Sequence, residues 1–313
     1  MSSQEFELTL QADPVYAFGI ILSIISDALH YELPSLRKTT INLIPGMFSP
    51  VSAVAEGEAD MGLTTPPVCV TLAYRGLGPF KKKMKNLRAI GSFPHDDRLM
   101  WAVTEDSGIN SIEEMKDKPG RLVLRSAEHP VRLVVEKILE AYGTSLNDLK
   151  RCGWQIIEES HTLKIPVFVT KGKADAVIDE ARKTPPWIQL TESRSMKFLP
   201  VREDVLQKME DQYGYRKAIL SKGMLRGIEK DVPCIDFSEW LMFVRDDMPD
   251  DFAYLIARIF DERKGQFEAY FRNIPLERSD LVYPIDMKKV WRNVGDIPLH
   301  PGAERYYREH GYM

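Results

Sequence analysis

Residues 41–76 alternate short apolar runs with helix-forming segments, which limits the chain to a small set of folds. Each apolar run is too short for a helix and predicts a buried strand. The expected elements are strands at 41–45 and 61–63 and helices at 50–57 and 66–75. Strands that alternate with helices form parallel sheets, and such sheets bind ligands at the carboxyl ends of their strands. The following helices begin at this edge, so we expect a ligand site there.

Five strand-to-helix junctions pair a polar residue with a proline, which fits the first turn of a helix. The pairs are Asp13-Pro14, Ser49-Pro50, Thr65-Pro66, His129-Pro130 and Thr184-Pro185. One such pair is commonplace, but five in series predict an architecture in which helix starts line a cleft. These helix starts would point free backbone N–H groups and positive dipole ends into the cleft. They do not identify the ligand.

The rest of the chain continues the alternation and predicts two α/β lobes. Further strands are expected at 5–10, 87–92, 99–104, 121–125, 154–158, 175–179, 196–200 and 234–245. Further helices are expected at 14–33, 130–142, 162–172, 186–193, 202–213 and 250–264, with a short helix capped by Ser111. The simplest arrangement makes 99–104 and 234–245 the crossings between lobes. Lobe I would then comprise 1–98 and 234–313, and lobe II, 99–233, would be inserted. Two crossing strands form a hinge, with a ligand cleft between the lobes.

Composition narrows the classes of function. The 313 residues are 44% hydrophobic, which is ample for a buried core, and the net charge of -4 does not favour nucleic-acid binding. Cys69, Cys152 and Cys234 are far apart and lack metal-binding spacing, so we expect no disulfide framework. We predict no bound metal and no cofactor. The apolar run 15–25 is too short to span a bilayer and has no basic segment before it. We therefore expect a cytoplasmic chain as written, or a periplasmic one if a leader was removed.

Several longer segments carry a family resemblance. They are AVAEGEADMGLTTPPVCVTLAYRG (53–76), LRAIGSF (87–93), VTEDSGINSIEEMKDK (103–118), VVEKILEAYGTSLNDLK (134–150), KGKADAVI (171–178), KFLPV (197–201), VPCIDFSEWLMFVRDDMPDDFAYLIARIFDE (232–262) and IPLHPGAERYYREHG (297–311). Over nearly its whole length the chain resembles the solute receptors of the TAXI branch of tripartite TRAP transporters. The resemblance implies a two-lobed α/β fold of the type II periplasmic-binding-protein kind, each lobe a central sheet flanked by helices. It also implies a small organic acid or amino acid bound between lobes that close on it.

The resemblance further implies ligand contacts in the loops that follow the strands. The implied positions are Asp13, Val15, Tyr16, Phe48, Ser49, Thr64, Thr65, Ser126, Glu128, His129, Asp179, Glu180 and Arg182. Arg182 is the best candidate for a carboxylate clamp, because a planar guanidinium binds such a group through two hydrogen bonds. Its alternative is an internal ion pair with Glu180 or Asp179, and Arg98 is the second choice of clamp. His129, at a helix start, is expected to be neutral and to contact a ligand or transfer a proton.

Three functions remain open at this point. The first is a solute-binding protein that closes on a small anionic ligand, a carboxylate. The alternative is a cytoplasmic enzyme on the same scaffold, because FPHDDRLMWAV (93–103) resembles a segment of dihydroxyphthalate decarboxylases. In that enzyme His129 or Glu180 would transfer the proton and Arg182 would hold a carboxylate. The third is a sensor or partner-binding module that uses the same cleft.

Two further arrangements are weighed against simpler explanations. The aromatic residues Tyr16, Phe48, Trp101 and Trp187 would form a stacking wall for a ring-bearing acid, although each is more often a core residue. A metal site is a minor alternative, because no local spacing supports it. Its ligands would be Asp13, Glu128, His129, Asp179 and Glu180. The sequence predicts no transmembrane segment and leaves open a homodimer.

Overall fold

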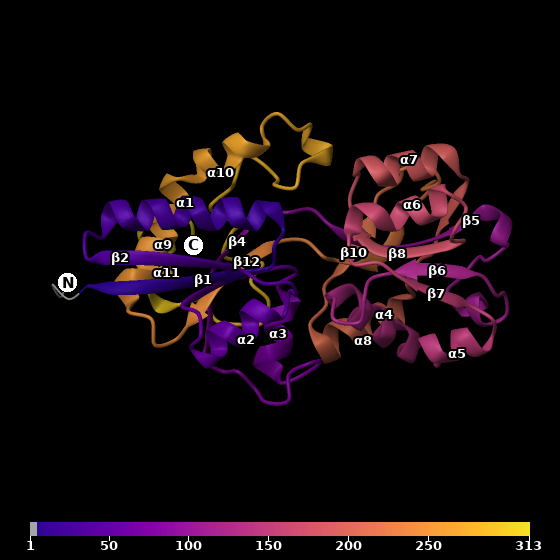
Figure 1. Cartoon of the computed structure of the whole chain (residues 1–313), viewed down its shortest axis with the longest axis horizontal. Helices are drawn as coiled ribbons and strands as arrows, with labels where there is room; N and C mark the ends of the chain where they lie inside the picture. Colours follow the sequence, from indigo (N-terminus) through magenta and orange to yellow (C-terminus); the bar gives the residue numbers. More distant parts are fainter. Residues whose placement is uncertain (1–4) are drawn as a thin grey trace. The chain divides into compact units, whose positions relative to one another are not determined.

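The computed structural model describes residues 5–313, which form two compact units. The first unit contains the chain up to Asp96 and again from Ser238 onward, and the second runs from Asp97 to Phe237. Each unit is built around a five-stranded mixed sheet with helices packed on it (Figure 1). Within the described residues, no helix is both long and apolar enough to cross a membrane.

The sheet of the first unit has the strand order β2-β1-β3-β12-β4. Its strands are β1 Phe6–Ala12, β2 Leu36–Leu43, β3 Met61–Thr64, β4 Leu87–Phe93 and β12 Trp240–Arg245. Strands β2, β1 and β3 are parallel, whereas β12 runs antiparallel to both of its neighbours. The expectation of a purely parallel sheet is therefore wrong at β12. This strand is apolar and almost wholly buried, as a central strand covered on both faces must be.

The part of this unit that the structure describes contains six α-helices. They are α1 Tyr16–Glu32, α2 Ser49–Glu56, α3 Val68–Arg75, α9 Asp250–Glu262, α10 Lys264–Phe271 and α11 Pro301–Glu309. Helix α1 lies on one face of the sheet, and α2 and α3 lie on the other (Figure 1). Strand β2 begins five residues earlier than the apolar run that predicted it. It is a partly exposed edge strand, so its polar residues need no burial.

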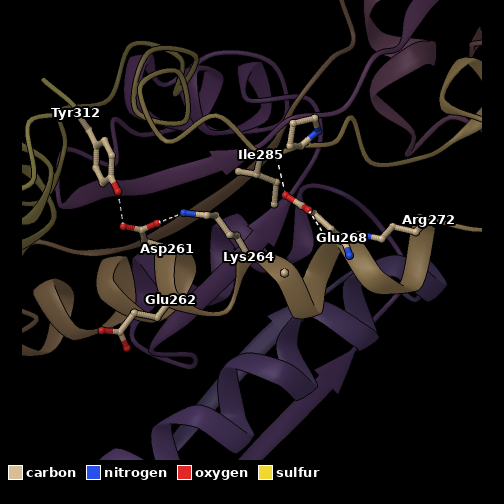
Figure 2. Close-up of a pocket in the computed structure, with 9 residues that line it drawn as sticks. Asp261, Glu262, Lys264, Glu268, Arg272, Ile285 and Tyr312 are labelled. Carbon is tan, nitrogen blue, oxygen red and sulfur yellow. Dashed lines mark hydrogen bonds and ion pairs between the residues drawn. The ribbon is translucent and has the colours of Figure 1, made fainter.

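A charged network ties the end of the chain to α9 and α10 (Figure 2). The Asp261 carboxylate accepts hydrogen bonds from Tyr306, Tyr312 and Lys264 at 2.9, 2.7 and 2.6 Å. Burial opposes ionisation of Asp261, but these three donors hold its pKa below the usual value. The hollow beside the network holds about 500 Å³ and is lined mainly by charged side chains that pair with one another. We interpret it as part of the structural anchor of the chain end.

The second unit has its own sheet, with the strand order β7-β6-β8-β5-β9, and a two-stranded ribbon β10-β11. The strands are β5 Arg98–Thr104, β6 Arg121–Leu124, β7 Gln155–Glu158, β8 Ala176–Ala181, β9 Met196–Phe198, β10 Lys217–Leu220 and β11 Val232–Ile235. The helices are α4 Pro130–Ala141, α5 Leu146–Arg151, α6 Ile165–Thr170, α7 Pro185–Ser193 and α8 Glu203–Tyr213. Strands β7, β6 and β8 are parallel, and β5 runs antiparallel to β8 and β9.

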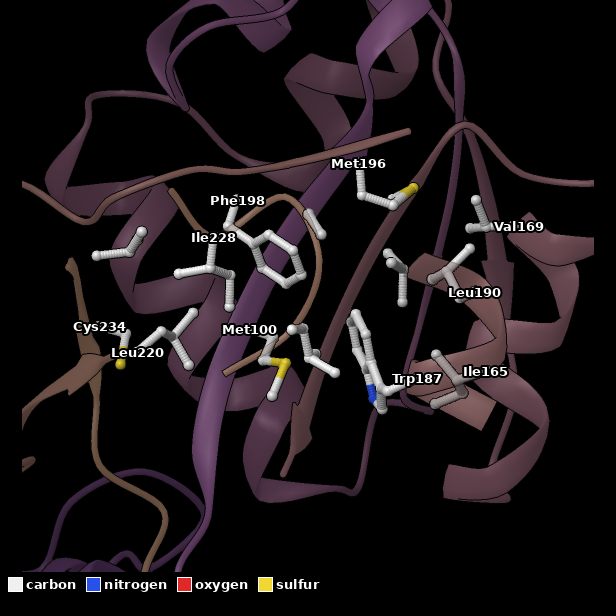
Figure 3. Packing of buried hydrophobic residues seen from close by; sticks show 14 of the residues in the cluster. Met100, Ile165, Val169, Trp187, Leu190, Met196, Phe198, Leu220, Ile228 and Cys234 are labelled. Carbon is white, nitrogen blue, oxygen red and sulfur yellow. The ribbon is translucent and has the colours of Figure 1, made fainter. Parts of the chain in front are cut away.

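The core of this unit packs β5, β6 and β8 against α6, α7 and the β10-β11 ribbon (Figure 3). Trp187 of α7 is 1% exposed and lies among Met100, Ile165 and Leu190. Trp101 is also buried and donates its indole N–H to the sulfur of Met115 at 3.2 Å. Both tryptophans are therefore core residues, the more common case expected from the sequence, and not a stacking wall.

The two crossings differ in detail from the expected ones. Strand β5, expected to cross, lies within the second unit, and the chain passes between the units at Asp96 and Asp97. The single strand expected at 234–245 is two strands, because β11 pairs with β10 in the second unit and β12 joins the first sheet. Glu239 lies between them with φ of 76°, a left-handed conformation that interrupts an extended chain.

Candidate functional site

The residues that cap the helix starts differ from those that the sequence predicted. Of the five junctions, His129 is the N-cap residue whose side chain accepts a helix N–H. Helix α1 begins after Val15, α2 after Phe48 and α3 after Pro67, and none of the three has a side-chain cap. The caps expected at 13, 49 and 65 are therefore wrong, as is the one at 111, because the short 3₁₀ helix there starts after Ile112. Thr184 is the N-cap residue of α7, and the helix starts at Pro185 as predicted, but the Thr184 side chain makes no capping hydrogen bond.

In the first unit the displaced capping residues connect neighbouring loops instead. Strands β1, β2 and β3 are parallel, so Ala12, Leu43 and Thr64 end at one edge of the sheet. At this edge the Asp13 carboxylate accepts the N–H of Gly46 at 2.7 Å. The sequence-predicted residues Asp13, Ser49 and Thr64 lie together at this edge, where Asp13 and Thr64 bond to loop atoms and Ser49 bonds to a side chain of β1.

The other predicted residues of this edge are also engaged. Gln11 donates its amide to the Ser49 hydroxyl at 2.9 Å, and Thr64 donates to the Met47 carbonyl at 2.6 Å. Thr65 donates to the carbonyl of Glu239 at 2.9 Å. The Phe48 ring packs edge-on against Phe80, with centroids 5.7 Å apart. The edge is thus a network of hydroxyl and loop-backbone groups, which positions polar atoms firmly.

Tyr16 lies beside a half-buried acid that the sequence did not single out. Its hydroxyl donates to the carboxylate of Asp280, and burial raises the pKa of that carboxyl to about 6. The ring of His95 contacts the Asp280 carbonyl at 2.6 Å and stacks on Trp240 with centroids 4.7 Å apart. Asp280 is some 260 residues from Tyr16 in the chain, and no local pattern could have joined them.

In the second unit an arginine that the sequence did not single out is the centre of the carboxyl edge. Arg125 follows β6 directly and is 5% exposed. Its guanidinium donates to Asp179 at 2.7 Å, to Glu180 at 3.1 Å and to the carbonyl of Ser160 at 2.6 Å. Parallel pairing of β6 with β8 places these groups side by side. A basic residue just after a buried strand was the signal that could have found it.

Asp179 is fully buried within β8, which was expected to end there. Burial raises the pKa of its carboxyl to about 6, while Arg125 and a hydrogen bond from Thr162 at 3.1 Å favour the ionised form. The pair of Arg125 with Asp179 is desolvated and hydrogen-bonded on both sides. Removing one partner would leave a buried charge, so the pair fixes the local backbone.

His129 stands at the start of α4 with a defined tautomer. Its Nδ1 accepts the N–H of Val131 at 3.2 Å, so the neutral ring carries its proton on Nε2. That Nε2 lies 3.5 Å from a carboxylate oxygen of Glu180. Burial, followed by the charge of Arg125, lowers the pKa of His129 well below its usual value. Near pH 7 the ring is a neutral hydrogen-bond donor. Ser126 accepts the His129 backbone N–H through its carbonyl at 3.1 Å.

The two arginines predicted as clamps occupy different surroundings. Arg182 follows β8 and is 8% exposed. Arg98 begins β5, opposite the end of β8 in register, and donates to Asp236 at 3.2 Å and to the Asp97 carbonyl at 2.7 Å. Asp236 also pairs with Arg216 at 2.5 Å. Both arginines therefore lie at the carboxyl edge of β8, and Arg98 is engaged there in an ion-pair chain with Asp236 and Arg216.

No metal centre is formed within the described residues. Between positions 5 and 313, no three His, Cys, Asp or Glu side chains are grouped closely enough to hold an ion. The cysteines are unbridged, with Cys69 and Cys234 buried and Cys152 exposed. Glu128 is exposed on the loop before α4. The minor alternative of a metal site gains no support from this geometry.

Two units, each with a mixed five-stranded sheet and joined by two crossings, define the two-lobed periplasmic-binding-protein fold. The chain belongs to the NMT1-like family, whose model matches residues 20–311. The match to the family model establishes the family, whereas the similarity to solved structures shows only a shared fold.

Solved structures of the same fold include XAC2383 from Xanthomonas citri. Its chloride-bound structure has a TM-score of 0.55 and 14% identity, and the match covers 99% of this chain and 100% of that one. Its ATP-bound structure has the same TM-score and identity, with 97% and 98% covered. PhnD1 from Prochlorococcus marinus (MIT 9301), in complex with methylphosphonate, has a TM-score of 0.52 and 12% identity, with 98% and 99% covered.

Proposed function

We propose that the chain is a solute-binding protein of the TAXI-like kind that binds a small organic anion, a carboxylate, at the carboxyl edge of the second unit. The observation that carries the proposal is the 8% exposure of Arg182 at the end of β8. A guanidinium that is largely withdrawn from water loses little further hydration when an anion reaches it. Its planar fork then binds the anion through two hydrogen bonds.

The charged residues around Arg182 support different roles for the two arginines of this edge. The buried Arg125 is matched by Asp179 and Glu180, so its charge is used within the protein. Arg182 directly follows β8 at the same edge, and we place the ligand against it. His129 adds a neutral Nε2–H donor at the start of the helix that follows the neighbouring strand. A neutral donor orients an oxygen without changing the net charge of the site.

The same features count against the decarboxylase alternative. A general acid must carry its proton at the working pH, and the pKa of His129 is too low for the ring to be cationic near pH 7. The nearest oxygen of Glu180 is bonded to Arg125, which holds it as an acceptor. Binding without turnover therefore fits the edge better. The solved structures of XAC2383 and PhnD1 contain anions, but at 14% and 12% identity they support the fold rather than the ligand.

Thermal-shift measurements of the whole chain against aliphatic and aromatic mono- and dicarboxylates, phosphonates and sulfonates test this proposal. A ligand at one hundred times its Kd stabilises the folded state by about 2.7 kcal/mol. We expect a carboxylate to stabilise the wild-type protein and to be recovered unchanged by mass spectrometry. Loss of carbon dioxide from it would make the protein an enzyme and overturn the binding-protein proposal.

Arg182→Ala should lose most of that ligand-induced shift, because the clamp is removed. Arg151→Ala is the matched control, since its side chain is 76% exposed on α5 in the same unit. If Arg182→Ala melts as the wild-type protein does and still binds the carboxylate equally well, the clamp assignment is wrong. A panel in which sulfonates or phosphonates bind and carboxylates do not would replace the carboxylate as the ligand class.

A further inference from the structure

A second hollow lies at the edge of the first sheet opposite the polar network of Asp13 and Thr64. It holds about 430 Å³, within the size range of small-molecule sites. Phe6 begins β1, Asp60 immediately precedes β3, and Arg245 ends the antiparallel β12. All three positions belong to the amino edge of the parallel strands. The hollow is therefore a separate site within the first unit.

The walls of the hollow are apolar. They are formed by Phe6, Leu8, Leu33, Met248 and Phe252. The rings of Phe6 and Phe252 meet edge-on, with centroids 6.2 Å apart. Leu8 and Leu33 are buried at 8% and 6% exposure, while the two rings and Met248 are half-buried. An apolar ring or alkyl chain that entered would be removed from water against these side chains, which favours binding.

The polar groups of the hollow carry an excess of negative charge. Asp60, Asp247 and Asp251 line it together with a single cation, Arg245. The guanidinium of Arg245 already has internal partners. It pairs with Asp247 at 3.0 Å and donates to the carbonyls of residues 54 and 59 at 3.1 and 2.9 Å. Asp251 pairs with Arg305 at 2.7 Å.

Asp60 differs from the other two acids. One of its oxygens accepts the Thr9 N–H at 2.7 Å. Within residues 5–313 no ion pair of Asp60 is found, and the side chain is half-buried. An unneutralised carboxylate beside apolar walls attracts a cation more strongly than one in open solvent, because water screens it less.

We propose that this hollow binds a small organic amine, with an apolar body against Phe6, Leu8 and Phe252 and an ammonium group against Asp60. The charge of the polar groups and the apolar character of the walls select this class over neutral alcohols and over acids. The site does not involve Arg182 or the carboxyl edge of the second unit, so it is independent of the anion proposed there.

Three probes with one carbon skeleton test the proposal by calorimetry on the whole chain: 4-phenylbutylamine, 4-phenylbutanol and 4-phenylbutyrate. We expect the amine to bind at least tenfold more tightly than the alcohol, and the acid to bind most weakly at this hollow. Asp60→Asn keeps an acceptor for the Thr9 N–H and removes the charge, so it should weaken the amine at least tenfold and leave the alcohol unchanged. Asp204→Asn, an exposed acid on α8, is the matched control and should change neither.

A second variant keeps the test valid if Asp60→Asn does not fold. Ser35 lines the hollow and is half-buried in the turn before β2, so Ser35→Phe adds a ring without removing any core side chain. It should abolish amine binding while the melting temperature stays within a few degrees of wild type. Equal affinity for amine and alcohol, or amine binding that survives either substitution, would overturn the proposal. Concentration-dependent self-association that Ser35→Phe blocks would assign the hollow to a second copy of the chain instead.

Discussion

At the scale of the residue, His129 combines two roles that can be separated by substitution. Its Nδ1 caps α4 and its Nε2 faces Glu180. His129→Ala removes both and should lower the free energy of unfolding by about 1 kcal/mol, the usual cost of a lost cap. His129→Asn restores a capping oxygen and should recover most of that stability. Chemical denaturation of both variants measures the difference.

Ligand binding should respond differently from stability. Both His129 variants lack the Nε2–H donor, so both should bind the carboxylate identified by thermal shift more weakly than wild type. If His129→Asn regains stability and full affinity together, the residue is a cap and nothing more. His161 offers a control, because it caps the 3₁₀ helix at 162–164 in the same way and is exposed.

The sequence was informative about residues whose role is local. The spacing of His129 and Pro130 predicted a helix start there, and the structure confirms the cap. Arg125 was missed because its partners, Asp179 and Glu180, lie 54 and 55 residues away and join it only when β6 pairs with β8. A sequence shows that an arginine follows a strand, but not that folding will bury it against two carboxylates.

At the scale of the element, the packing of α11 on α9 depends on a glycine. A Cβ on Gly302 would lie 1.9 Å from the carbonyl oxygen of Asp250, a backbone atom that cannot rotate away. Gly302→Ala should therefore force the helices apart and destabilise the protein by about 2–4 kcal/mol, as overpacking and strain do. Thermal or urea unfolding measures the loss.

Gly265 provides the matched control for that substitution. It lies in α10 of the same unit, and a Cβ there would meet nothing within 4 Å. Gly265→Ala should stabilise the protein by about 0.5–1 kcal/mol, because alanine loses less backbone entropy in a helix. Equal effects of the two substitutions would show that α11 does not need close contact with α9.

Most elements could be predicted from periodicity, and the errors have physical causes. Helices α1, α4 and α9 lie within two residues of the predicted starts and ends, because each presents a clear apolar stripe. The strand predicted at 234–245 was wrong because its apolar residues continue through a break at Glu239. A run of apolar residues indicates burial but not which sheet a strand joins. Strands β11 and β12 are both buried, but they belong to different sheets.

At the scale of the whole molecule, the buried Asp179 and the half-buried Asp280 should make stability depend on pH between about 4 and 6. The carboxyl pKa is raised to about 6 for both Asp179 and Asp280, against about 3.9 in an unfolded chain. In this window the folded state binds more protons than the unfolded state, so these groups favour folding below pH 4 and lose that contribution as pH rises to 6.

Asp280→Asn isolates one of these groups, since the amide oxygen still accepts the Tyr16 hydroxyl. We expect the variant to be more stable than wild type at pH 7 by about 1–2 kcal/mol, allowing for solvent screening, and equal to it near pH 4. Urea unfolding at four pH values across the window measures this. A stability difference that does not vary with pH would show that Asp280 is ionised normally in the folded chain.

The position of β12 has a consequence for the order in which the molecule can be made. This strand lies between β3 and β4, yet among the strands of the described residues it is the last to leave the ribosome. When residue 237 has been synthesised, every strand of the second sheet is available, whereas the first sheet is still two separate pieces, β2-β1-β3 and β4. Domains generally fold as units during synthesis, so the inserted unit can complete its core first. The sheet of the first unit cannot be completed until residues 240–245 have been synthesised, because they form the strand that lies between β3 and β4.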